Sequence, residues 1–234
     1  MQDTRDDGSS ISDANLSDAV TTLAPLENAY GELKSAYEGK MNIQNDDTDP
    51  DGNSDSMLPS QHIAKMNWDL STVDIAADAL SKAATALENA VNAIADARKT
   101  AMAQWKGDAA KAADEDFGTI GSDCSDQLSR VKGMDTAMTG QSGVVPALKS
   151  MAQAIDSEAH TLASQNSANV ETVYDAGQSQ SSSGDKSGAD SLTGAQRQIY
   201  QAITTMKNYI WTELEGLSGV TKQLGSYQQA VVEV

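Results

Sequence analysis

The chain has 234 residues with 34 acidic and 16 basic side chains, which gives a formal net charge of -18 at pH 7. A field of that sign repels phosphate backbones and anionic lipid headgroups, so neither nucleic acid nor an anionic membrane surface is an expected partner. Aromatic residues make up 4% of the chain and there are 4 prolines, a composition that favours helices over a β-sandwich or barrel. The single cysteine, Cys124, excludes an intramolecular disulfide and a cysteine-based zinc site within one chain.

The segment from Met1 to Gly8 is acidic and polar, and it lacks the basic start and apolar run of a Sec-type signal peptide. No stretch of the sequence approaches the length of continuous apolar residues that a transmembrane helix needs. We therefore expect no transmembrane segment, and any export must use a route that does not read such a signal.

Apolar residues recur at helical spacing along most of the chain. This pattern predicts helices at about 12–38, 67–104, 108–139, 144–175 and 193–232, with a turn at 140–143. The expected fold is all-α, an elongated antiparallel helical bundle built on a long helical hairpin. The expected domains are an acidic N-terminal helix and loop at 1–60, the hairpin at 61–140, a fourth helix at 141–176, a flexible Ser/Gly linker at 177–192, and a C-terminal helix at 193–234 that joins the same bundle.

The most regular pattern lies between Leu70 and Trp105. Apolar residues there alternate steps of three and four positions, and only Arg98 interrupts them. A repeat of 3.5 residues held over this length indicates a long helix packed along another helix.

The sequence Trp105-Lys106-Gly107-Asp108 follows this pattern and precedes the next predicted helix. Gly107 permits the positive φ that a tight reversal needs, and Asp108 suits the N-cap of the following helix. Trp105 would lie where the two helices diverge, either buried as a core residue or exposed for recognition. These residues predict a helical hairpin on physical grounds alone.

Trp105-Xaa-Gly107 between two long helices, followed by Ala109, Ala110 and Phe117, resembles the WXG family of type VII secretion substrates. The resemblance covers about residues 67–139. It implies a non-enzymatic helical hairpin that is exported without a cleaved signal peptide and found in the medium or at the cell surface. It also implies two partners, the secretion ATPase and a second WXG-like helical protein. The chain departs from the smallest family members through its additional helices on both sides of the hairpin, and its oligomeric state is left open.

Members of that family carry a Tyr-Xaa-Xaa-Xaa-Asp/Glu export signal after the hairpin, and Tyr209 to Glu213 matches it. The i to i+4 spacing places the phenol and the carboxylate on one helix face, where they can contact each other. The alternative interpretation is an ordinary exposed helix face.

An aspartate-rich loop has the oxygen-donor spacing of calcium loops. Its aspartates stand at loop positions 1, 3, 5 and 9, with glycine at position 6: Asp47, Asp49, Asp51, Asp55 and Gly52. Position 12 is Leu58, which cannot supply the bidentate carboxylate of an EF-hand, so any calcium site here would be weak. The alternative is a solvated acidic loop, and we expect no other cofactor.

Little in the sequence favours catalysis. His62 and His160 lie in different segments, and neither forms a metal-ligand pair at helical spacing. No Gly-rich phosphate loop and no nucleophile elbow is present. The expected function is that of a non-enzymatic, secreted substrate or partner of a type VII secretion system. Two alternatives remain: a targeting or chaperone module for a separate secreted toxin, and a structural coiled-coil protein of the cell surface.

Overall fold

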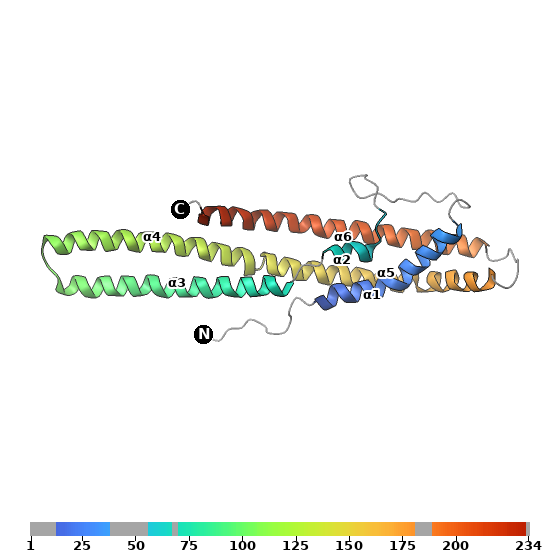
Figure 1. Ribbon diagram of the computed structural model, residues 1–234, viewed down its shortest axis with the longest axis horizontal. Coiled ribbons are helices and arrows are strands. Elements are labelled where there is room, and N and C mark those ends of the chain that lie inside the picture. Colours follow the sequence, from blue (N-terminus) through green and yellow to red (C-terminus); the bar gives the residue numbers. More distant parts are fainter. Residues whose placement is uncertain (1–12, 38–55, 67–69, 181–188, 233–234) are drawn as a thin grey trace. The chain divides into compact units, whose positions relative to one another are not determined.

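A computed structural model describes residues 13–37, 56–66, 70–180 and 189–232 (Figure 1). The helices within these ranges are α1 (Asp13–Tyr37), α2 (Pro59–Lys65), α3 (Leu70–Gln104), α4 (Asp108–Thr139), α5 (Val144–Gln180) and α6 (Ala189–Val232). The described ranges contain no strand, so the predicted all-α class is confirmed.

The chain divides into two compact units. The first, which we call the hairpin unit, contains α3, α4, the start of α5 up to Leu148 and the end of α6 from Leu217. The second, the core unit, contains α1, α2, residues 149–180 of α5 and residues 189–216 of α6.

In the hairpin unit, α3 and α4 run antiparallel and pack against each other, as the 3.5-residue repeat predicts (Figure 1). Ala77 and Ala84 are buried in the seam, whereas the larger seam residues between them and Trp105 are only half-buried. Small side chains at the seam let the two backbones approach closely, but they bury little apolar surface. The hairpin unit therefore depends on polar contacts between the helices as well as on apolar packing.

Such contacts between α3 and α4 include three pairs. Lys132 Nζ donates to Glu88 Oε1 over 2.7 Å, and the Ser81 hydroxyl donates to Asp135 Oδ1. The third is the pair of Arg98, the one residue that interrupts the apolar pattern, with Asp114. Arg98 breaks the apolar pattern because its charged group has a partner on the facing helix.

The core unit holds the largest fully buried apolar side chains in the described residues. They come from four helices: Leu23, Leu26 and Leu33 of α1, Pro59 of α2, Ile155 of α5, and Ile199, Met206 and Ile210 of α6. Each such side chain contributes roughly 1.5–3 kcal/mol on burial. α1 therefore belongs to the core, where it packs against α2 and contacts α6 through Tyr30 and Tyr200.

The short helix α2 is fixed to α1 by a buried carboxylate. Glu27, 8% exposed, accepts a hydrogen bond from the backbone N–H of Ser60 (2.8 Å) and another from the Ser60 hydroxyl (2.5 Å). The unpaired N–H groups at the start of a helix favour such a negative partner. Aromatic contacts extend this packing to α6, where the Tyr30 and Tyr200 ring centroids lie 4.7 Å apart and those of His62 and Trp211 lie 5.8 Å apart.

The predicted turn at 140–143 is confirmed, and it depends on its glycines. A Cβ on Gly140 would lie 2.4 Å from the carbonyl oxygen of Thr136, and one on Gly143 would lie 2.7 Å from that of Met138. Any larger residue at these positions would force the backbone apart.

Several predicted boundaries need correction. The predicted hairpin at 61–140 begins too early, because Pro59–Lys65 forms the separate helix α2, which packs on α1. Proline at the first helical position and Gln61, whose side chain accepts a hydrogen bond from the Leu58 N–H, explain why this helix forms. The predicted linker at 177–192 is too long, because α5 continues to Gln180 and α6 already begins at Ala189. Glutamine and alanine at these ends are good helix formers despite the serine-rich surroundings.

Candidate functional site

The reversal between α3 and α4 is built around Gly107. Its backbone has φ 100° and ψ −177°, a conformation that is essentially restricted to glycine. The Gly107 carbonyl accepts hydrogen bonds from the N–H groups of Ala110 (3.1 Å) and Lys111 (3.2 Å), which begins α4. The prediction that Gly107 permits a positive-φ reversal is confirmed. The predicted cap needs correction, since Gly107 is the N-cap and Asp108 is the first helical residue, where its charge still suits the helix dipole.

Trp105 stands immediately before this reversal and is 47% exposed. Its backbone N–H still donates to the Ala101 carbonyl (3.0 Å), so the end of α3 fixes the position of the residue. Of the two interpretations left open by the sequence, the structure excludes the fully buried core tryptophan. Nearly half of a large aromatic side chain is thus available to a partner at the end of the hairpin.

Other apolar side chains of the hairpin unit are exposed as well. Phe117 and Ile120 of α4 are 38% and 48% exposed, and Ile75 of α3 is 69% exposed. Phe117 lines a groove of about 640 Å³ along α3 and α4, to which Val91, Ile94 and Met102 also contribute. This arrangement is suited to receiving apolar side chains of another protein.

Arg98 and Asp114 form the charged part of the same groove. Arg98 Nε donates to Asp114 Oδ1 over 2.6 Å. This hydrogen bond, reinforced by the charge of the guanidinium, lowers the pKa of the Asp114 carboxyl and raises that of Arg98. Both side chains remain substantially exposed, so solvent screens their attraction.

The candidate export signal lies on α6 in the core unit, and its two residues interact as their spacing predicts. Burial is the first cause that raises the pKa of the Tyr209 phenol, and the charge of Glu213 and a hydrogen bond to it raise it further. The Glu158 carboxylate of α5 adds a smaller effect in the same direction. Tyr209 and Glu213 are both half-buried, so the pair lies at the edge of the core rather than on a fully exposed face.

The calcium candidate, Asp47, Asp49, Asp51 and Asp55, lies outside the described residues. Its role as a calcium loop stays a prediction.

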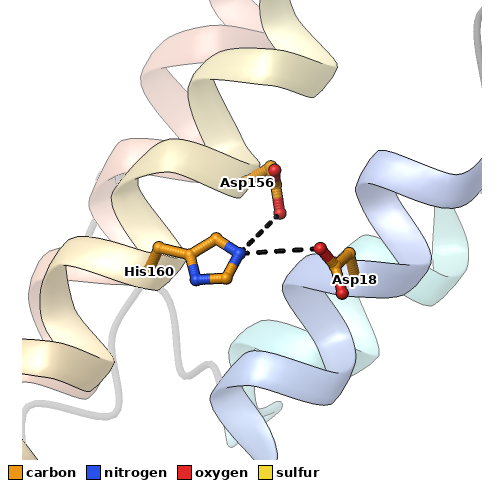
Figure 2. Close-up of side chains that lie close together, drawn as sticks. All are labelled: Asp18, Asp156 and His160. Atoms are coloured by element: carbon orange, nitrogen blue, oxygen red, sulfur yellow. Dashed lines mark ion pairs between the residues drawn. The ribbon is translucent and has the colours of Figure 1, made fainter.

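Another cluster was missed by the sequence analysis. His160 Nε2 lies 3.6 Å from Asp18 Oδ2 and 3.7 Å from Asp156 Oδ1, as Figure 2 shows. The three ligand atoms lie within 4.8 Å of one another, a spacing that suits a metal ion. Asp156 precedes His160 by four residues, so the two side chains lie on one face of α5, a pairing that the sequence analysis did not consider. That spacing was readable in the sequence, but Asp18 on α1 is brought to the pair only by the fold.

Comparisons of the chain with family models, with curated proteins and with solved structures give no match. Among the described residues, no helix is both long enough and apolar enough to serve as a membrane span.

Proposed function

We propose that this protein is a non-enzymatic secreted substrate or partner of a type VII secretion system, and that it acts by helical docking on the secretion ATPase. The observation that carries the proposal is the half-exposed Trp105 beside the positive-φ Gly107, at the reversal of two long antiparallel helices. An exposed tryptophan held on a rigid helix end is well suited to anchor a protein–protein contact, because it offers a large apolar area at low entropic cost.

The second docking element in this proposal is the pair Tyr209 and Glu213. Their interaction holds the phenol and the carboxylate together on one face of α6. This preorganisation lowers the entropic cost of binding to a receptor. The sequence match is common by chance, but the observed interaction is the feature that a bipartite side-chain signal requires.

The exposed apolar residues of the hairpin favour a second candidate, the targeting or chaperone module for a separate secreted toxin. Ile75, Phe117 and Ile120 are all exposed on α3 and α4, and exposed apolar surface of this kind favours a helical partner. In this role the partner is a second WXG-like helical protein or the helical segment of a toxin. Copurification from the native host distinguishes the two roles, because a chaperone module leaves the cell with its partner bound.

The proposal is tested by export from the native host. Wild type, Trp105→Ala and Glu213→Ala are compared in culture supernatants of strains with and without the secretion ATPase. Tyr174→Ala is the matched control, because it removes an aromatic side chain of similar exposure (42%) from α5, outside both docking elements.

We expect wild type and Tyr174→Ala in the medium only when the ATPase is present. Trp105→Ala and Glu213→Ala should show reduced export at unchanged cellular levels. Export that does not need the ATPase, or no export in any strain, would refute the secretion role. The structural coiled-coil alternative would instead be supported if the protein forms homo-oligomers and if Trp105→Ala is exported as well as wild type.

A further inference from the structure

The cluster of Asp18, Asp156 and His160 joins two helices of the core unit that are far apart in sequence. Asp156 and His160 lie one turn apart on α5, and Asp18 faces them from α1 (Figure 2). Ile155 and Ala159, their neighbours in the chain, are fully buried. The buried neighbours fix the backbone of α5, so the positions of the two ligands on it are set by the packed core.

The distances within the cluster do not fit hydrogen bonding. Separations of 3.6 and 3.7 Å between His160 Nε2 and the two carboxylate oxygens exceed the range of an N–H···O hydrogen bond. Two ligands bound to one tetrahedral ion at about 2.1 Å each are about 3.4 Å apart. The two separations from His160 are within about 0.3 Å of that value, and the two carboxylate oxygens lie within 4.8 Å of each other.

An unsatisfied oxygen provides an independent indication. The Asp156 side chain is 22% exposed, but its Oδ1 atom is solvent-inaccessible and accepts no hydrogen bond. Its polar contact is the 3.7 Å ion pair with His160 Nε2, which is longer than a hydrogen bond, and native structures usually give such an oxygen a closer partner. Figure 2 shows this oxygen directed toward His160 Nε2, so the two atoms can act as ligands of one ion.

We propose that Asp18, Asp156 and His160 bind a divalent transition-metal ion, with Zn²⁺ as the best match, and that the ion links α1 to α5. One imidazole nitrogen and two carboxylate oxygens form a mixed donor set that zinc accepts at tetrahedral geometry, with water as the fourth ligand. Calcium and magnesium prefer sites made of oxygen ligands alone and are expected to bind more weakly. Asp18 and His160 are 63% and 56% exposed, so the ion enters directly from solvent.

The ion would stabilise the core unit, because α1 and α5 present its ligands together only in the folded state. At a zinc concentration about 100 times the dissociation constant, the unfolding equilibrium constant falls about 100-fold. The site needs neither the reversal at Trp105 nor the Tyr209–Glu213 pair, so it stands independently of the proposed function.

The test is calorimetric titration of the metal-free full chain with Zn²⁺, followed by thermal unfolding with and without the ion. The variants are Asp18→Asn, Asp156→Asn and His160→Ala. Asp116→Asn is the control, since it removes an exposed carboxylate from α4 and leaves the cluster intact. Circular dichroism verifies that each variant keeps its helical content, and the exposed positions of Asp18 and His160 make their variants the least disruptive.

We expect one zinc site in wild type and in Asp116→Asn, with a raised unfolding midpoint. Loss of a direct ligand should weaken binding by more than the 10–100-fold typical of outer-shell changes. Zinc binding that is equal in wild type and His160→Ala would assign the ion to other acidic residues and overturn the proposal. Absence of binding to wild type would overturn it as well, and the cluster would then connect α1 and α5 only through the contacts of His160 with its two aspartates.

Discussion

The conformation of Gly107 makes the substitution Gly107→Ala a direct test of how the hairpin is built. A Cβ at this position would meet no atom within 4 Å, so the substitution creates no clash with neighbouring residues. The cost lies in the backbone, because φ 100° and ψ −177° are strained for alanine by roughly 1–3 kcal/mol. Alanine also lowers the conformational entropy of the unfolded chain, and this effect stabilises the folded state by about 0.4–1 kcal/mol. The difference between the two effects is about 0–2.6 kcal/mol, and its central value is a net loss of stability of about 1.3 kcal/mol.

Gly121→Ala is the matched control for this substitution. Gly121 lies inside α4, its backbone φ is not positive, and a Cβ there would likewise meet nothing within 4 Å. Alanine in a helix interior is favoured over glycine by roughly 0.5–1 kcal/mol. The same chemical change should therefore destabilise the hairpin at position 107 and stabilise it at position 121.

Native-state hydrogen exchange of the α3 and α4 amides is the suitable measurement. It reports the opening free energy of the hairpin itself, whereas a single unfolding midpoint would combine the two units. Faster exchange in Gly107→Ala and slower exchange in Gly121→Ala would agree with the reasoning. Stabilisation by both substitutions, or no effect at 107, would refute the view that backbone strain at Gly107 defines the reversal.

Three further predictions follow from burial and charge. Trp105→Ala should change the opening free energy of the hairpin by under about 1 kcal/mol, because the side chain is half-exposed. Removal of a buried tryptophan would instead cost about 3–5 kcal/mol. Hydrogen exchange of the α3 amides measures this change. Arg98→Gln should raise the pKa of Asp114 toward its ordinary value, which NMR titration of the carboxyl carbon measures. In wild type, the pair stabilises the hairpin at pH values above the ordinary carboxyl pKa. This stabilisation is lost as the pH falls through the lowered pKa of Asp114. Ile155→Ala should lower the opening free energy of the core unit by about 2–5 kcal/mol, as measured by hydrogen exchange of the α5 amides, because Ile155 is fully buried. The same change at the exposed Ile75 should stay within about 0.5 kcal/mol in the α3 amides, and equal effects at the two isoleucines would contradict the assignment of Ile155 to the core.

The helices and the reversal were predictable because their signals are local. Periodic apolar residues set the start of α4 at Asp108 and its end at Thr139, and the predicted α3 ended correctly at Gln104. Errors occurred where local composition and helix propensity disagree. The serine-rich sequence near Gln180 indicated a linker, although α5 continues to Gln180. Helix α2 was missed because its seven residues are too few to show a periodic apolar pattern.

The sequence by itself determined the helical class, the long α3–α4 hairpin and the position of its reversal. Those features depend on residues within a few turns of one another, such as the seam of α3 and Gly107. Only the tertiary structure decided that Trp105 stays half-exposed, that α1 joins the core unit, and that Asp18 approaches Asp156 and His160. Periodicity shows which face of a helix is apolar, but it does not show which helix covers that face. The residues beside a buried stripe, and the contacts they make, are therefore set by packing between segments that are distant in sequence.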